Sequence, residues 1–179
     1  KAQYEFDAMV IDIQNAGIEV KVFEDTLEPI KPDAVFPNNW ITTHQNGEVV
    51  LYPMLADNRK LEVRLDVLEW LSPKTIHDYR KVGKDTQVLE GTGSVIFDHE
   101  SKIMYLGVSA RSDEGLAKKL AEQYGFTICS FDATDHQNNS IYHTNVLMFV
   151  MHGMVGIGLE TIRDAVERKR VEKTILDSG

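Results

Sequence analysis

Residues 87–94 read Gln87-Val88-Leu89-Glu90-Gly91-Thr92-Gly93-Ser94, an apolar run that ends abruptly in polar and small residues. The same pattern occurs before it, at Ala34-Val35-Phe36-Pro37-Asn38-Asn39-Trp40, and after it, at Ser140-Ile141-Tyr142-His143-Thr144-Asn145. We interpret each copy as an apolar strand that ends in a polar turn, because turn-forming residues interrupt the run each time. This recurring polar turn organises the chain.

A β-rich segment follows each polar turn. These segments are residues 41–52, 95–105 and 146–159. Equivalent positions recur about every fifty residues, a period typical of repeat architectures in which each unit buries its apolar face against its neighbours. If the units close around an axis, Asn39, Glu90 and His143 converge on it. An amide, a carboxylate and an imidazole at one point would form a site.

The composition indicates one globular domain. The chain has 179 residues, of which 42% are hydrophobic, and a formal net charge of −9. That charge argues against nucleic acid or an anionic membrane as a partner, and no apolar run is long enough to span a bilayer. The first residues contain no apolar signal core. The single cysteine, Cys129, excludes an internal disulfide, which favours a cytoplasmic setting.

The segments between the polar turns predict alternating helices and strands in a single domain, residues 1–179. Apolar residues from Phe6 to Ile13 share one helical face, and Gly17 ends that helix. Asn46-Gly47 and Met151-His152-Gly153 predict hairpin turns. The other expected elements are strands at 18–23, 75–79 and 126–131, a hairpin of 95–97 with 103–105, and helices at 61–71, 116–124 and about 160–175.

Glu90 and His143 are the first candidates for chemistry. The glycines after Glu90 allow close packing around a ligand or a tight turn, and alone Glu90 fits better as a solvated glutamate at a bend. His143 could act as a general acid/base, because imidazole titrates near neutrality, although a single histidine is more commonly hydrogen-bonded in a core. Their equivalent positions in the repeat favour a functional pair.

Asn38-Asn39 and Arg111 are candidates for ligand contacts. Asn favours turns, but the repeat position of Asn39 gives a ligand contact equal standing. Arg111 precedes a predicted helix and could bind a substrate carboxylate through two hydrogen bonds. It could equally lie on the surface near Asp113 and Glu114. The sequence leaves both interpretations open.

No metal or cofactor site is predicted. The other histidines form no close-spaced metal motif, and Met148, Met151 and Met154 are interpreted as core filler. Cys129 lies in a predicted strand away from the polar turns, so a small buried thiol is favoured over a nucleophile. The glycines after Glu90 do not form a phosphate loop, because no Gly-Lys-Ser/Thr follows them.

Six short motifs occur in a set order along the chain. They are Phe36-Pro37-Asn38-Asn39-Trp40, Tyr52-Pro53-Met54, Asn58-Arg59, Leu89-Glu90-Gly91-Thr92-Gly93-Ser94, Ser109-Ala110-Arg111-Ser112 and Tyr142-His143-Thr144-Asn145-Val146. Together they resemble the pentein superfamily of guanidino-group-modifying enzymes, over essentially the whole chain. The nearest branch is the arginine-deiminase-related amidinotransferase group, which includes citrulline-utilisation hydrolases.

The resemblance implies an α/β propeller of ββαβ-type units around a pseudo-fivefold axis. Three polar turns imply that about three of the repeats are present, so the chain is expected to be the middle of a longer, truncated catalytic domain. Pentein enzymes attack a guanidinium or ureido carbon with a cysteine thiolate near the C-terminus. Cys129 does not match that place, so we expect the nucleophile outside these residues and no turnover by this chain alone.

The remaining roles are implied by position. Glu90 matches the glutamate that grips the planar nitrogen group, and His143 matches the acid/base that protonates the leaving amine and activates water. Arg111 matches an arginine expected to bind a substrate carboxylate or to order the site. The implied substrate-binding residues are Asn39, Arg111, Asn38, Asn145 and Phe36.

Asn39 and Asn145 stand at positions that are often aspartate in the superfamily. Less local negative charge, and amides that both donate and accept hydrogen bonds, are expected to suit a neutral ureido group. The resemblance therefore implies C–N bond hydrolysis of an arginine derivative, at the ureido group of citrulline or the guanidinium of arginine. Succinylarginine dihydrolases also use Asn and accept a guanidinium.

Two alternatives stay open. One is an arginine deiminase or amidinotransferase on the same fold, and the other, of a different class, is a non-catalytic pentein binding module. A small-molecule substrate is the expected partner, and the sequence carries no signal for an oligomeric state.

Overall fold

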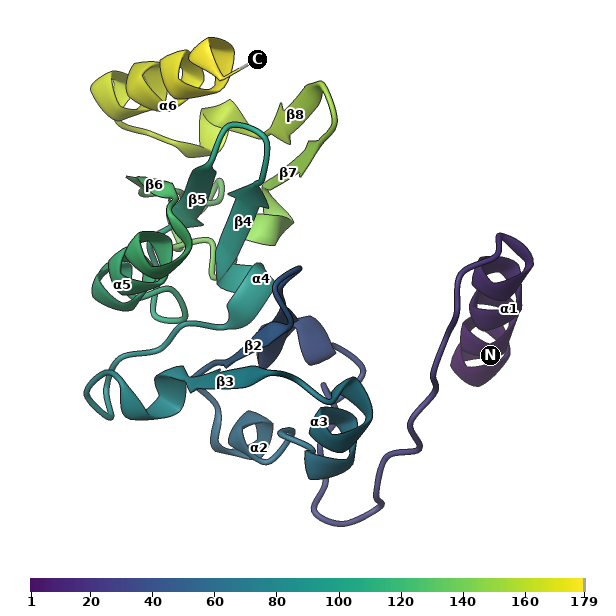
Figure 1. Cartoon of the computed structure of the whole chain (residues 1–179). Helices are drawn as coiled ribbons and strands as arrows, with labels where there is room; N and C mark the ends of the chain where they lie inside the picture. Colours follow the sequence, from purple (N-terminus) through teal and green to yellow (C-terminus); the bar gives the residue numbers. More distant parts are fainter. Residues whose placement is uncertain (179) are drawn as a thin grey trace.

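Three small β-sheets, each beginning with an antiparallel hairpin, form the body of the protein (Figure 1). The computed structural model describes residues 1–178. The first sheet contains β1 (Ile41–Thr43), β2 (Glu48–Leu51) and β3 (Thr75–Asp78). The second contains β4 (Val95–Asp98), β5 (Ile103–Gly107) and β6 (Thr127–Phe131), and the third contains β7 (Met148–Met151) and β8 (Met154–Ile157). The three predicted hairpins are confirmed.

The first two sheets share one topology. In each, a helix follows the hairpin and returns the chain to a third strand that lies parallel to the second. The helices are α3 (Leu65–Leu71) in the first unit and α5 (Glu114–Tyr124) in the second. In the third unit α6 (Ala165–Asp177) follows the hairpin. The two complete units are therefore ββαβ repeats, the type of unit that the resemblance implied.

Local sequence signals explain where these elements begin and end. Gly47 adopts a φ of +82° in the β1–β2 turn, a conformation that glycine adopts without steric cost. Asp113 caps α5 by accepting a hydrogen bond from the backbone N–H of Leu116. Gly125, with a φ of +70°, ends the same helix in the left-handed region.

Two of the apolar core clusters cover the two faces of the second sheet, and a further cluster lies within the first unit. Side chains alternate along a strand, and β5 accordingly sends Met104 and Leu106 into one cluster and Tyr105 into another. The first cluster joins Tyr52 of the first unit to Leu120 of α5. The second cluster lies against the third hairpin and α6. Both faces of the second sheet are thus buried against neighbouring units.

The polar turns are short helical turns: η1 (Pro37–Asn39), α4 (Gly91–Ser94) and η3 (Thr144–Val146). The prediction that an apolar strand precedes each one is wrong. Leu89 forms an isolated bridge with Ser112, and Ser140 forms one with Thr134. The N–H of Leu89 bonds to the carbonyl of Pro53 in the first unit. Because successive backbone groups bond to separate loops, no continuous ladder forms.

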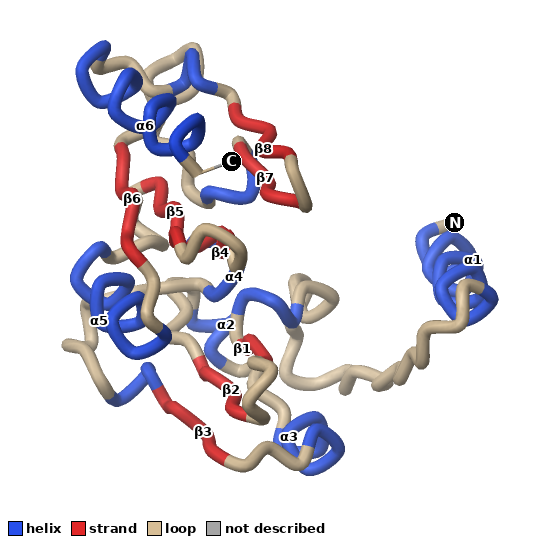
Figure 2. The backbone as a smooth tube through the Cα atoms, turned by 45° about the horizontal axis from the view of Figure 1, so that its top comes forward, coloured by secondary structure: helices blue, strands red, loops and turns tan. Residues whose placement is uncertain are grey.

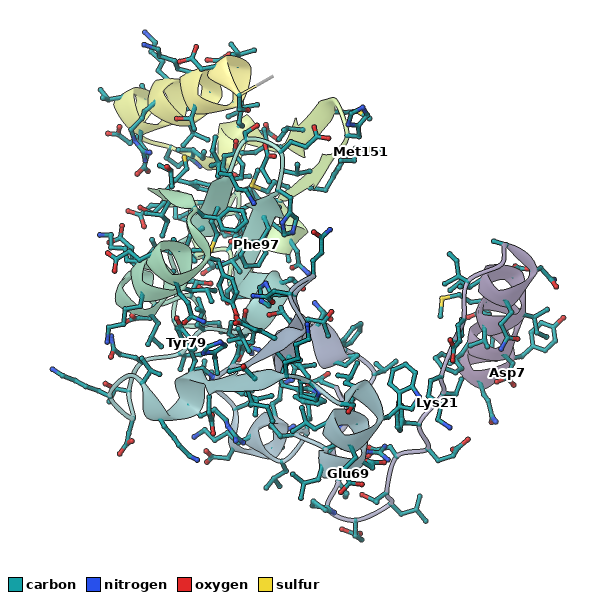
Figure 3. All side chains as sticks on the ribbon, in the orientation of Figure 1. Asp7, Lys21, Glu69, Tyr79, Phe97 and Met151 are labelled. Atoms are coloured by element: carbon teal, nitrogen blue, oxygen red, sulfur yellow. The ribbon has the colours of Figure 1, made fainter. Side chains whose placement is uncertain are left out.

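The predicted strand at Ile18–Phe23 is also wrong. Residues 18–26 lie in neither a helix nor a strand, and they pair with no strand among residues 1–178. The preceding helix, α1 (Ala2–Asn15), buries none of its side chains. Figures 1 and 2 show α1 apart from the body, and in Figure 3 the labelled Asp7 and Lys21 lie on this separate part. A strand needs a neighbour to satisfy its backbone groups, and the local sequence cannot supply one.

Two helix boundaries differ from expectation. The helix predicted at 61–71 begins only at Leu65, as α3, and a separate short helix, α2 (Asp57–Lys60), precedes the predicted range. The helix predicted from about residue 160 begins instead at Ala165, after the short turn η4 (Leu159–Thr161). Asp164 sets this start, because its Oδ1 accepts a hydrogen bond of 2.7 Å from the N–H of Glu167.

Candidate active site

Glu90 and His143 meet between the second and third units. Glu90 immediately precedes α4 and is fully buried, and His143 immediately precedes η3 and is 6% exposed. Glu90 Oε2 lies 2.7 Å from His143 Nε2. The two residues are 53 positions apart in the chain. The equivalent polar turns therefore converge, and they form a carboxylate–imidazole pair shielded from water.

Several donors converge on the Glu90 carboxylate. The N–H of Leu55 donates to Oε1 at 2.9 Å, and Arg111 Nη1 donates to Oε2 at 3.2 Å. Arg59 Nη1 lies 3.9 Å from the same Oε2. Burial by itself would raise the pKa of Glu90, but the bonds from His143 and Leu55 and the charge of Arg111 lower that pKa below its ordinary value. Glu90 is therefore held as a carboxylate.

The side-chain amide of Asn39 is fixed beside this pair. Arg59 Nη1 donates to Asn39 Oδ1 at 3.0 Å, so the Nδ2 group of Asn39 faces the backbone carbonyl of Glu90, at 3.4 Å. Arg59 is itself held by Glu62 through two hydrogen bonds of 2.9 and 3.0 Å. Both members of this ion pair are buried. Glu62 offsets the charge of Arg59, and Arg59 sets the orientation of the amide.

Two glycines of α4 allow the turns to approach one another. A Cβ at Gly93 would lie 2.4 Å from Asn39 Nδ2 and 2.9 Å from His143 Cε1. A Cβ at Gly91, where φ is +45°, would lie 2.2 Å from the carbonyl oxygen of Asn38. Any side chain at either position would push the first or third unit away. These glycines therefore let the three polar turns pack directly against one another.

Hydroxyl groups connect the turns through the backbone. The Ser94 hydroxyl donates to the carbonyl of Arg111, and the Thr144 hydroxyl donates to the carbonyl of Ser94. The same Thr144 oxygen accepts a bond of 2.8 Å from the N–H of Gly107. Thr144 and Ser94 are both fully buried. These bonds fix the turn that carries His143 to the turn that carries Glu90.

The other three residues predicted to contact a ligand, Asn38, Phe36 and Asn145, are exposed. Asn38 is exposed and donates from Nδ2 to the Thr92 hydroxyl at 3.2 Å. Phe36 is 53% exposed, and Asn145 is exposed as well. Within residues 1–178, neither Phe36 nor Asn145 makes a side-chain hydrogen bond or ion pair to Glu90 or His143. The structure therefore brings together Glu90, His143, Asn39 and Arg111, and leaves the other three at the periphery.

Arg59 and Glu62 are the site residues that the sequence analysis missed. Their spacing of three residues is the ordinary signal for an ion pair on an exposed helix surface. The one signal for a buried role is the Asn58-Arg59 motif, to which the sequence alone attaches no function.

Cys129 is placed away from this pair. It lies in β6 within the second core cluster, with Phe131 and Val171. Arg170 Nη1 lies 3.6 Å from its Sγ. Burial raises the pKa of the Cys129 thiol, despite the opposing charge of Arg170. A buried thiol with a raised pKa is a weak nucleophile.

Two further findings bear on the class of site. Across residues 1–178, no three histidine, cysteine, aspartate or glutamate side chains gather in a way that could hold a metal ion. None of the helices in that range combines the length and apolarity needed to cross a lipid bilayer.

Comparison with solved structures shows the same fold in an arginine dihydrolase and in a protein that binds ornithine and NAD⁺. ArgZ, a cyanobacterial arginine dihydrolase of the ornithine–ammonia cycle, matches with a TM-score of 0.73 and 19% identity over 95% of this chain and 26% of its own. AgrE in complex with ornithine and NAD⁺ matches with a TM-score of 0.73 and 21% identity, over 95% and 24% of the two chains. At these identities the likeness shows the fold.

A dimethylarginine dimethylaminohydrolase, in an adduct with 4-chloro-2-hydroxymethylpyridine, gives a TM-score of 0.65 and 14% identity. The match covers 93% of this chain and 63% of that one. The present chain thus spans from about a quarter to less than two thirds of these solved chains. No curated protein matches it in sequence.

The profile of the eukaryotic N,N-dimethylarginine dimethylhydrolase family matches residues 1–179, the whole chain. The folds of ArgZ and of the dimethylaminohydrolase agree with that match. The chain therefore belongs to the eukaryotic N,N-dimethylarginine dimethylhydrolase family and, with it, to the pentein superfamily.

Proposed function

We propose that this chain forms the acid/base part of a hydrolase site that cleaves a C–N bond of an arginine derivative. The substrate group is the ureido group of citrulline or the guanidinium of arginine. The observation that carries the proposal is the dry contact of 2.7 Å between Glu90 and His143, next to the oriented amide of Asn39. A carboxylate and an imidazole arranged in this way can grip a planar N–H group and transfer protons to and from it.

Each side chain then has a distinct role. Glu90 accepts N–H bonds from the planar nitrogen group, and its ionised form is the one favoured by its surroundings. His143 gives a proton to the departing amine and later removes one from the attacking water. Asn39 contacts the substrate group through an amide that can donate or accept. Arg111 binds a substrate carboxylate, and Asn38, Asn145 and Phe36 complete the contacts at the periphery.

The covalent step requires a thiolate that is not supplied by Cys129. In this step a sulfur–carbon bond forms at the central carbon, the C–N bond breaks, and His143 protonates the nitrogen that leaves. Water then hydrolyses the adduct and restores the thiolate. We infer that the nucleophile comes from outside the 179 residues, within a single catalytic domain whose ββαβ units form a five-unit propeller.

The amide of Asn39 supports a neutral ureido substrate. It lies beside the Glu90–His143 pair, where Arg59 Nη1 donates to its Oδ1 at 3.0 Å. A carboxylate at this place would favour a cationic guanidinium through charge-assisted bonds, whereas an amide both donates and accepts hydrogen bonds, which suits a ureido group. Asn39 is the specific observation in favour of citrulline.

Ligand binding to the 179-residue chain tests the proposal. Isothermal titration with L-citrulline, L-arginine and Nω,Nω-dimethylarginine should show binding that Glu90→Gln abolishes. Glu48→Gln is the matched control, because Glu48 also bonds a histidine, His77, at 3.0 Å but lies outside the site. The chain should release neither ornithine nor ammonia. Binding that is insensitive to Glu90→Gln would contradict the proposal, and so would turnover by the 179-residue chain, whether or not Cys129→Ser removes it.

The product distinguishes hydrolysis from the alternatives. In the natural protein that carries these residues together with a site cysteine, ornithine as the product means hydrolysis and citrulline means deimination. Ligand binding without any product in that protein would favour the non-catalytic binding module. A clear preference for arginine over citrulline would defeat the ureido assignment.

A further inference from the structure

The Glu90 carboxylate is already occupied by a guanidinium, that of Arg111. Both oxygens have donors, since Leu55 N–H bonds to Oε1, and His143 Nε2 and Arg111 Nη1 both bond to Oε2. A ligand N–H group that binds Oε2 must therefore displace one of the two donors on that oxygen. Which of these donors is displaced determines how a ligand reaches the Glu90 carboxylate.

Arg111 is the donor that can leave. The side chain of His143 is 7% exposed and that of Arg59 is 5% exposed, whereas that of Arg111 is 30% exposed. The Leu55 donor is a backbone group fixed in the chain. Only Arg111 has open space toward solvent, so it can withdraw from Glu90 without unpacking the core.

Tyr142 holds Arg111 at the edge of the site. The guanidinium carbon of Arg111 lies 5.4 Å from the centre of the Tyr142 ring, within the range of a cation–π contact. The Ser109 hydroxyl ties the two residues together through the backbone, because it donates to the carbonyl of Tyr142 at 2.7 Å and accepts from the N–H of Arg111 at 3.1 Å. Arg111 can therefore leave Glu90 while it remains over Tyr142.

We propose that Arg111 is an internal competitor that occupies the guanidinium position on Glu90, and that Tyr142 is a positioning residue that retains Arg111 for a ligand carboxylate after displacement. This inference rests on the proposed function. A ligand's planar nitrogen group replaces Arg111 on Oε2, and the freed guanidinium then pairs with the carboxylate at the other end of the same ligand. Ligands that carry both groups recover the lost contact, and ligands with only one do not.

The inference predicts opposite effects of one substitution on two classes of ligand. Arg111→Gln should tighten binding of methylguanidine and methylurea about fivefold or more, because the competing state is removed. It should weaken binding of L-arginine and L-citrulline about tenfold, because their carboxylate loses a charge-assisted partner. Titration calorimetry on the 179-residue chain measures both, and thermal unfolding shows whether each variant is folded.

Tyr142 is tested by a matched pair of variants. Tyr142→Phe keeps the aromatic face and should bind L-citrulline like the unaltered chain, whereas Tyr142→Leu should weaken that binding about two- to fivefold. Neither should change methylurea binding by more than about twofold. Arg111→Lys is the second variant at the competitor position, and it should retain part of the carboxylate binding while losing the planar contact with Glu90.

The possible failures are distinguishable. If Arg111→Gln weakens both classes of ligand alike, Arg111 is only a structural support of Glu90, and this inference is overturned while the proposed function stands. If no ligand responds to Glu90→Gln, the proposed function itself fails.

Discussion

Gly91 is the residue whose replacement tests the approach of the turns most directly. It combines a φ of +45° with a Cβ position 2.2 Å from the Asn38 carbonyl oxygen, which is backbone and cannot rotate aside. Gly91→Ala should lower the free energy of unfolding by about 3 kcal/mol, from left-handed strain and overpacking together. Urea denaturation followed by tryptophan fluorescence measures the change.

Gly125→Ala is the matched control for this prediction. Gly125 has a φ of +70°, but nothing lies within 4 Å of the position of its Cβ. Gly125→Ala should therefore lower the free energy of unfolding only through the strain of a left-handed alanine, by about 1 kcal/mol. Equal losses in the two variants would show that the contact with Asn38 carries no cost.

His44 should make stability depend on pH. Its ring stacks on Tyr124 at 4.0 Å, and it is half-buried. Burial lowers the pKa of His44 below its ordinary value of 6.5; Glu48 opposes this, and His99 and His77 add to it. The unfolded chain therefore binds the proton at a higher pH than the folded chain does. The stability that the neutral His44 ring contributes is fully present above pH 6.5. It should be lost as the pH falls from there through the lower pKa that His44 has in the folded state.

His44→Phe keeps the aromatic stack and should flatten this decline in urea denaturation between about pH 7 and pH 5. The exposed His136 supplies the control, since His136→Phe should leave the pH profile unchanged. A profile that His44→Phe does not alter would assign the pH dependence to other groups.

The sequence predicts the site residues that stand at equivalent positions of the repeat, Glu90 and His143. It does not predict Arg59 and Glu62, which support the site from within the first unit. Glu90 and His143 each immediately precede the same kind of polar turn, so the repeat period alone is enough to argue that they converge. Arg59 and Glu62 look like an exposed helical pair, and their burial depends on the first unit closing over them. Phe36 belongs to one of the recurring motifs, but its side chain is exposed at the periphery of the site.

At the scale of the element, a side chain that caps a helix stabilises it, and Asp113 does so for α5. Its Oδ1 accepts from the N–H of Leu116 at 2.8 Å and from Gln87 Nε2 at 3.0 Å. Asp113→Ala should cost about 1 to 2 kcal/mol of folding free energy, because a helix N–H loses its partner and α5 packs on the core. Asp164→Ala, which removes the cap of α6, should cost less, because α6 buries only Val171. Thermal unfolding compares the two; an equal loss would contradict the contribution of packing.

The isolation of α1 predicts its dynamics. The helix has 14 residues and buries no side chain, and helices of that length are marginal in water without tertiary contacts. Its amides should exchange with solvent at close to unprotected rates, while those of α5 are protected by the core. Hydrogen–deuterium exchange with mass spectrometry measures both. Comparable protection of α1 and α5 would show that α1 is covered in solution.

Helices and strands were predictable from the sequence where one or two residues determine where they begin or end. The hairpin turn at Asn46-Gly47 and the end of α5 at Gly125 depend on the chemistry of one or two residues. The segment 18–23 has the composition of a strand, yet a strand exists only where a neighbour accepts its backbone groups. The start of α6 depends on one side-chain cap, which apolar periodicity does not detect.

At the scale of the whole molecule, the first core cluster should make the first two units unfold together. Leu120 of α5 is fully buried in this cluster with Tyr52 of the first unit. Leu120→Ala should cost about 2 to 5 kcal/mol. Because Trp40 is buried in the first unit, its fluorescence transition should shift by the same amount as the circular dichroism transition.

Leu176→Ala is the control at an exposed leucine, which is 72% accessible, and it should leave both transitions in place. If Leu120→Ala shifted only the circular dichroism signal, the units would unfold independently and the shared core would contribute little cooperativity.

The spacing of Glu90 and His143 also has a consequence for biosynthesis. A ribosome adds the residues that surround the carboxylate from one side, Leu55 and Arg59, before Glu90 itself. The imidazole is added 53 residues after Glu90. During that interval the nascent chain carries the Glu90 carboxylate without its imidazole partner. The order of translation thus completes the buried carboxylate–imidazole pair only when the third hairpin unit is made.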